Sequence, residues 1–295
     1  MNKILSIICL MLVLLLPSNR TGYSQQQAQP WVLQEMTWTD VQAYLEHNDM
    51  VIIPMGSTEQ HGPHLPLGTD CFEAFDIARE ISSKTGVVVA QILWVGYSAY
   101  HSGFPGTLSI RPQTMEQVLF EATEYLIKYG FRRIMFFNYH GGNDIVQRNV
   151  IHRINQETQA IAVAIGIGSS LQSQAEKDSL DYHAGVRETS AMLFLRPDLV
   201  RKERIEKPVM HFTPLMEELM KQSEEYPKLS TTWNNLLGAP VETGKGGASH
   251  ELTNNGIWTL RDPKTATADE GKIMIQRLVE RAVTFIKAWE NVNTR

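Results

Sequence analysis

Three stretches of the chain bring together histidines and carboxylates, the side chains that bind metal ions and move protons. The first is GSTEQHGPHLPLGTD, residues 56–70, where Glu59 and His61 are two residues apart. In an extended segment such side chains point to the same side, so both could reach one metal ion. Asp70 precedes a helical pattern, where an acid commonly caps a helix. Its proximity to Glu59 and His61 favours a role as a metal ligand instead.

The second stretch is FFNYHGGND, residues 136–144, in which a predicted strand ends, the chain turns at two glycines and a helix begins. Ligands of open α/β sheets bind beyond the carboxyl ends of the strands, so His140 stands where chemistry is expected. Gly141 and Gly142 would let the backbone approach a metal ion or a substrate closely. Asn143 can either cap the helix or orient a ligand.

The third stretch is DYHAGVRETSAMLFL, residues 181–195, with His183 and Glu188 on either side of a glycine turn. Glu188 begins a segment with helical spacing of apolar residues. It can be a metal ligand, or only a first-turn acid that interacts favourably with the helix dipole.

Together the stretches supply a predicted ligand set of two histidines and three carboxylates: Glu59, His61, Asp70, His140 and Glu188. Imidazole and carboxylate without thiolate suit zinc, manganese or iron(II). We expect two divalent ions, zinc in the first place and manganese or iron as alternatives. A bridging carboxylate could hold two ions that share a hydroxide, which is a nucleophile near neutral pH. His183 remains free to move protons.

Two further histidines lie close to these motifs. His64 belongs to the first stretch and is predicted to support the ligands rather than to bind an ion. His101 precedes the turn FPGT, residues 104–107, and is a candidate substrate contact. Gly141, Gly142 and Asn143 are candidates for the same supporting or substrate-binding roles.

The elements that must position these residues follow from the pattern of apolar residues. Short apolar runs predict buried strands at 50–55, 87–95, 133–138 and 161–168. Helical spacing of apolar residues predicts helices at 113–129, 144–157 and 275–289. Strands that alternate with helices indicate an α/β fold with a mostly parallel sheet covered on both faces.

The segment 205–245 carries four prolines and a glycine-rich end, so we expect an irregular excursion rather than a second domain. Such a segment could cover an active site or form a subunit interface. The expected organisation is a signal peptide at 1–24 followed by one catalytic domain at 30–295.

The amino terminus predicts export. Lys3 precedes an apolar run at 4–16, and small residues before position 25 indicate cleavage after Ser24, which gives a secreted or periplasmic protein. The run of 13 residues is shorter than the roughly 20 that a spanning helix needs, so no stable membrane span is expected after processing. The net charge of −5, without basic runs, argues against a nucleic-acid partner.

The sequence resembles the creatininase (creatinine amidohydrolase) family through four motifs in the family's order and approximate spacing: EQHGPHLPLGTD, FPGTLS, NYHGGN and HAGVRETS. The resemblance implies a three-layer α/β/α sandwich, a homo-oligomer that is commonly a hexamer, and hydrolysis of amide or related bonds at a two-metal centre. It implies metal-ligand positions for Glu59, His61, Asp70 and His140, with Asp70 as the bridge. It also implies that Glu188 completes the site and that His183 protonates the leaving nitrogen.

Two positions depart from true creatininases. Gly142 stands where they carry a glutamate, and Ser179 stands where they carry a tryptophan that stacks on creatinine. We therefore expect an exported two-metal hydrolase that opens an amide-type C–N bond of a small cyclic or linear substrate other than creatinine. The alternatives are a hydrolase that opens a C–C or lactone-type ring of an oxidised sugar or cyclitol, and an inactive metal-bearing binding protein.

Overall fold

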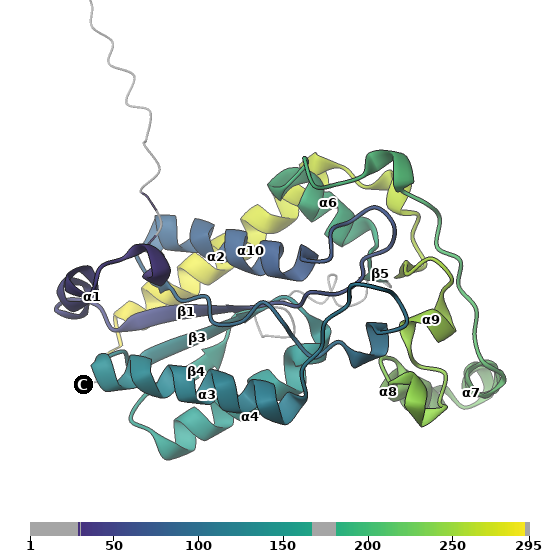
Figure 1. Ribbon diagram of the computed structural model, residues 1–295, viewed down its shortest axis with the longest axis horizontal. Coiled ribbons are helices and arrows are strands. Elements are labelled where there is room, and N and C mark those ends of the chain that lie inside the picture. The colour runs from purple at the N-terminus through teal and green to yellow at the C-terminus, as the bar shows by residue number, and fades with distance from the viewer. Residues whose placement is uncertain (1–28, 30, 167–180, 293–295) are drawn as a thin grey trace, which may run out of the picture.

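The computed structural model describes residues 29, 31–166 and 181–292, and its centre is a four-stranded parallel sheet (Figure 1). The strands lie in the order β2-β1-β3-β4. They are β1 (Met50–Met55), β2 (Val88–Val89), β3 (Arg133–Asn138) and β4 (Ile161–Ala164). The predicted runs at 50–55 and 133–138 are confirmed with the same bounds.

The run predicted at 87–95 pairs with its neighbour at only two residues, Val88 and Val89. Beyond them the chain leaves the sheet, and the Trp94 carbonyl accepts a hydrogen bond from the Thr58 hydroxyl at 2.7 Å. This departure forms the loop that carries Ser98 and His101 towards the site. The last two residues of the run predicted at 161–168 lie outside the described residues.

Side chains of β1 point alternately to the two faces of the sheet. On one face, Val51 and Ile53 pack against helices α1 (Trp38–Leu45), α3 (Pro112–Tyr129) and α4 (Asp144–Glu157). On the other face, Met50 and Ile52 pack against α2 (Thr69–Thr85), α6 (Val186–Leu195) and α10 (Ala268–Glu290). Because both faces of the sheet are covered, the strands are apolar apart from Arg133 and Asn138 at the two ends of β3. The predicted three-layer α/β/α sandwich with a mostly parallel sheet is confirmed (Figure 1).

A second, two-stranded sheet pairs β5 (Asp181–His183) antiparallel with β6 (Trp258–Thr259). It joins the candidate catalytic histidine to the carboxyl-terminal part of the chain. Single turns of 3₁₀ helix lie at Leu33–Glu35, Ala99–His101, Gly141–Asn143, Lys202–Arg204, Pro227–Leu229, Val241–Thr243 and Pro263–Thr265.

The segment 205–245 is more regular than predicted. It contains α7 (Pro214–Glu225) and α8 (Ser230–Leu236), and α9 (Ser249–Leu252) follows. Pro214 occupies the first helical position of α7, and the Thr213 hydroxyl caps the helix by accepting from the Met216 amide. Proline disrupts the interior of a helix but suits its first turn. Pro214, one of the four prolines on which the predicted irregular segment rested, therefore marks the start of a helix.

No helix among the described residues is long and apolar enough to cross a membrane. The predicted signal peptide at 1–24 and Ser179 lie outside the described part of the chain.

Candidate metal centre

The histidines and carboxylates singled out from the sequence converge beyond the carboxyl ends of β1 and β3. Met55 and Asn138, the last residues of these strands, are paired neighbours. The loops that follow them carry Glu59 and His140, and thus start side by side. This is the edge where open parallel sheets place their ligands.

Asp70 lies at the centre of the cluster, in the first turn of α2. Its Oδ1 is 3.1 Å from His61 Nε2, and its Oδ2 is 3.1 Å from His140 Nδ1. All three side chains are buried. The close contact at Oδ2 lacks hydrogen-bond geometry, and this oxygen has no hydrogen-bond partner among the described residues. One carboxylate thus directs its two oxygens towards two different imidazoles.

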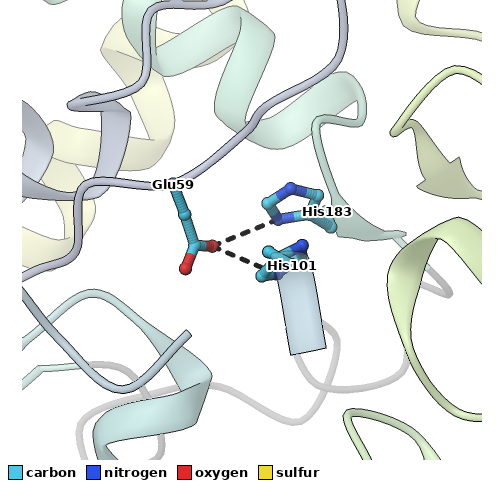
Figure 2. A group of neighbouring side chains, drawn as sticks. All are labelled: Glu59, His101 and His183. Carbon is cyan, nitrogen blue, oxygen red and sulfur yellow. Dashed lines mark ion pairs between the residues drawn. The ribbon is translucent and has the colours of Figure 1, made fainter. Parts of the chain in front are cut away.

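Glu59 is the second buried carboxylate (Figure 2). Its Oε2 accepts a hydrogen bond from the Ser98 hydroxyl and lies 3.3 Å from His140 Nε2. Its Oε1 faces His101 Nε2 at 3.3 Å and His183 Nδ1 at 3.7 Å. That oxygen, too, has no hydrogen-bond partner in the part of the chain that the structure describes.

Glu188 completes the arrangement from the start of α6. Its Oε2 lies 3.8 Å from His61 Nε2 and accepts a hydrogen bond from the Ala184 amide at 2.5 Å. Ala184 has a φ of +50°, a left-handed conformation that is unusual for a residue with a side chain. The tight turn between His183 and Glu188 brings both side chains back to the same centre. The Glu188 side chain is 21% exposed, whereas those of the other four predicted ligands are almost fully buried.

Within the described residues, three groups of side chains have potential ligand atoms within 4.8 Å of one another. They are Glu59 with Asp70 and His140, His61 with His183 and Glu188, and Glu59 with His101 and His183. The first two contain all five predicted ligands, and Asp70 reaches both because its Oδ1 contacts His61. The donor set of imidazole and carboxylate, with buried oxygens that lack hydrogen-bond partners, fits divalent ions.

Charge in the cluster is shared through protons. Burial alone would lower the pKa of His61, but the facing Asp70 and Glu188 raise it to about 10. Burial raises the pKa of Glu188 to about 7, against the opposing effect of His61. Divalent ions would compete with these protons for the same lone pairs, so binding of ions should weaken as the pH falls.

The candidate supporting residues hold the loops in place. His64 Nε2 lies 2.9 Å from the hydroxyl of Thr189, the residue next to Glu188. Asn143 occupies the N-cap position of α4, but its side chain makes no capping hydrogen bond. Instead its amide nitrogen donates to the Gly56 carbonyl at 3.0 Å and its amide oxygen accepts from the Tyr97 amide at 3.1 Å. Asn143 therefore connects the loop at Gly56, which leads to Glu59, with the loop at Tyr97, which leads to His101.

Gly142 occupies a place where no side chain fits. A Cβ there would lie 2.2 Å from the Tyr97 carbonyl oxygen and 2.5 Å from His140 Nε2. His140 Nε2 is already 2.9 Å from that carbonyl, a contact that orients the ring. A Cβ on Gly141 would meet nothing within 4 Å. The glycine that departs from the creatininase pattern is thus required by the packing around His140.

Glu73, which lies on α2 three residues after Asp70, was not among the residues predicted from the sequence. Glu73 is buried, and neither of its carboxylate oxygens has a hydrogen-bond partner among the described residues. Burial, reinforced by Glu188 and Asp70, raises the pKa of Glu73 well above its usual range. The signal in the sequence was the spacing, because residues three apart share one face of a helix.

Gly142→Ala should weaken metal binding, since the added Cβ must displace His140 or the loop at Tyr97. We expect the affinity for zinc to fall by about 10- to 100-fold, the range typical when the groups that orient a ligand are disturbed. Gly141→Ala, next in sequence and open to solvent, is the matched control and should bind zinc as the parent protein does. Titration with a competing chelator measures both, and equal affinities would contradict the role given to Gly142.

Comparisons with known proteins agree with the fold. The family model for creatininase, described as creatinine amidohydrolase, matches residues 34–286. A mycofactocin precursor peptide peptidase of Mycolicibacterium smegmatis is 35% identical over 251 residues, which cover 82% of this chain and 85% of the relative. A 3-dehydro-scyllo-inosose hydrolase of Thermotoga maritima is 32% identical over 180 residues, which cover 58% of each protein.

A solved structure described as "Creatininase Mn" superposes with a TM-score of 0.69, covering 90% of this chain and all of that chain. At 22% identity this likeness shows a shared fold. The family match spans both strand-end loops, the turn with His183 and Glu188, and most of α10. The chain therefore belongs to the creatininase family of hydrolases.

Proposed function

We propose that this protein is an exported hydrolase that uses two divalent ions to open an amide-type C–N bond of a small cyclic or linear substrate. The observation that carries the proposal is the position of Asp70, whose two oxygens each lie 3.1 Å from a different histidine. Each of these histidines also faces a further acid, Glu188 in one case and Glu59 in the other.

In this proposal Glu59, Asp70 and His140 would hold one ion, and His61, Asp70 and Glu188 would hold the other. Zinc is the expected metal, with manganese or iron as alternatives, because the donors are nitrogen and oxygen only. When bound, such ions lower the pKa of a coordinated water, which makes it a nucleophile near neutral pH, and their positive charge polarises a carbonyl group.

His183 is the group placed to move protons. Its Nε2 lies 2.6 Å from the Gln60 backbone carbonyl, which can only accept, so Nε2 carries the proton and donates it there. Its Nδ1 then presents a lone pair towards the cluster, 3.7 Å from Glu59 Oε1. From this position Nδ1 can take a proton from the attacking water and return it to the leaving nitrogen.

One observation favours the amide bond, and another argues against one particular amide. The peptidase relative, at 35% identity, is named for cleavage of a peptide precursor, and a peptide bond is an amide. True creatininases carry a glutamate at the position of Gly142, and here there is no space for one, which argues against creatinine as the substrate.

A second candidate function is the hydrolytic opening of a C–C or lactone-type ring in an oxidised sugar or cyclitol. It is supported by the inosose hydrolase relative, at 32% identity. The same cluster could serve either reaction, because both begin with attack of water on a polarised carbonyl carbon.

His183→Ala should abolish turnover while the protein keeps its ions, because His183 moves protons and is not among the ligands proposed for either ion. We expect kcat to fall by at least about 100-fold, a typical contribution of a positioned acid–base group. Metal content measured on the same sample separates loss of proton transfer from loss of metal. His152→Ala, on the exposed face of α4, serves as the control. Activity that survives both His183→Ala and removal of metal by a chelator would contradict the proposal.

Product analysis should decide which bond is opened. We expect a panel of short peptides, formamides and cyclic amides to release an amine or ammonia. A new carboxylate without release of nitrogen, formed from cyclic ketones or lactones, would instead support the second function. Mass spectrometry of the products with ¹⁸O-labelled water shows where oxygen enters in either case.

Export predicts a mature protein that begins at Gln25. Expression of the full chain in a bacterial host with an active secretion system should give protein in the periplasm or the medium. The amino terminus of that protein should lack residues 1–24, as intact-mass measurement can show. Full-length protein confined to the cytosol would contradict export while leaving the proposed chemistry untouched.

A further inference from the structure

Two histidine rings face Glu59 Oε1, and the proposed mechanism gives a role to only one of them, His183 (Figure 2). His101 Nε2 lies 3.3 Å from this oxygen and His183 Nδ1 lies 3.7 Å from it. The ring centroids are 4.2 Å apart. These three side chains form the third group whose atoms are close enough to hold an ion. What the group does depends on which ring nitrogens carry protons.

The side chain of Gln60 decides this question. Gln60 stands between Glu59 and His61, so in an extended segment its side chain points away from theirs. Its Oε1 accepts a hydrogen bond from the Gly62 amide at 2.9 Å, and its Nε2 donates to the Gly256 carbonyl at 3.1 Å. These two partners fix which end of the amide is oxygen and which is nitrogen.

The second N–H of Gln60 Nε2 is then directed at His101 Nδ1, 3.0 Å away. An amide nitrogen only donates, so His101 Nδ1 accepts, and a neutral His101 must carry its proton on Nε2. The Ser249 hydroxyl, 2.6 Å from the same Nδ1, donates as well. His101 therefore carries its proton on Nε2, the ring nitrogen that lies 3.3 Å from Glu59 Oε1.

His183 has the opposite arrangement, with a lone pair on the ring nitrogen nearer to Glu59. Its Nε2–H donates to the backbone carbonyl of the same Gln60 at 2.6 Å, which leaves the Nδ1 lone pair towards Glu59. Both rings carry the proton on Nε2, but they face Glu59 through different nitrogens. One residue, through its side chain and its main chain, thus sets one histidine as a donor and the other as an acceptor.

We propose that Gln60 is a positioning residue that fixes the protonation pattern of His101 and His183, so that the group at Glu59 Oε1 handles protons and holds no third ion. An ion there would need a lone pair on His101 Nε2. The proton would have to move to Nδ1, where it would meet the N–H of Gln60. The inference rests on the proposed function, since it assigns Nδ1 as the working atom of His183.

The space around Gln60 supports a positioning role. The side chain is buried, and a Cβ on Gly256 would lie 2.0 Å from Gln60 Oε1. Gly256 also has a φ of +74°, which favours glycine. The side-chain amide of Gln60 is therefore enclosed between the Gly62 amide and the Gly256 carbonyl, with little space to exchange the positions of its oxygen and nitrogen.

The test is nitrogen-15 NMR of the mature, zinc-loaded protein labelled at histidine, with signals assigned by single histidine substitutions. We expect both His101 and His183 to carry the proton on Nε2. In Gln60→Glu, a carboxylate that can only accept should draw the His101 proton to Nδ1, whereas Ser249→Ala should leave it on Nε2. A wild-type His101 with its proton on Nδ1 would overturn the proposal, and this spectrum is decisive even if Gln60→Glu folds poorly.

Kinetics and metal content give a second measurement. Gln60→Glu should lower kcat by about 10- to 100-fold with KM little changed. The control is Gln91→Glu, which alters a glutamine that also donates to a backbone carbonyl, that of Leu93, away from the centre. His101→Ala should keep the same number of zinc ions per chain as the parent protein. Loss of one ion in His101→Ala, or unchanged kcat in Gln60→Glu, would overturn the inference. A wild-type protein that binds no zinc would overturn the proposed function instead, while the proton positions could still be read in the metal-free protein.

Discussion

The architecture of the site depends on one constraint, the burial of several carboxylates around Asp70. Glu59, Asp70 and Glu73 are almost completely removed from water, and Glu188 is largely so. Burying uncompensated charge is costly, so such a group must bind protons, cations or both. In the structure the neighbouring imidazoles provide part of this compensation, and three carboxylate side chains still have oxygens without a hydrogen-bond partner among the described residues. Two divalent ions at Asp70 would compensate Asp70 and Glu59, and a proton would neutralise Glu73, whose pKa burial raises well above its usual range.

The rest of the fold brings these charges together from distant parts of the chain. Adjacent parallel strands end at the same edge and deliver Glu59 and His140, while β5 and the left-handed turn at Ala184 deliver His183 and Glu188. The carboxyl-terminal segment adds Ser249 and the Gly256 carbonyl, which reach the centre through His101 and Gln60. These contributions all lie within residues 34–286, the part of the chain that the family model matches.

Much of this could be predicted from the sequence where the signal is local. The run at 50–55 and the interior of the run at 133–138 are apolar because both faces of the sheet are covered, and the bounds of both runs were predicted correctly. The cluster of Glu59, His61 and Asp70 was found because its members lie within twelve residues of one another. The helix at Pro214 was missed because proline was read as a break. Gln60 was missed because its role lies in contacts with His101 and Gly256, which are distant in sequence and meet only in the folded chain.

The most direct test of the account is the metal content of the purified mature protein, compared with that of Asp70→Asn, a substitution of nearly equal size. The account predicts about two divalent ions per chain in the parent protein, as for other two-metal hydrolases. It predicts that Asp70→Asn stays folded, as its circular dichroism should show, but loses both ions, because the one group that contacts both halves of the site is impaired. A folded parent protein without bound ions, or an Asp70→Asn protein that retains both, would contradict it.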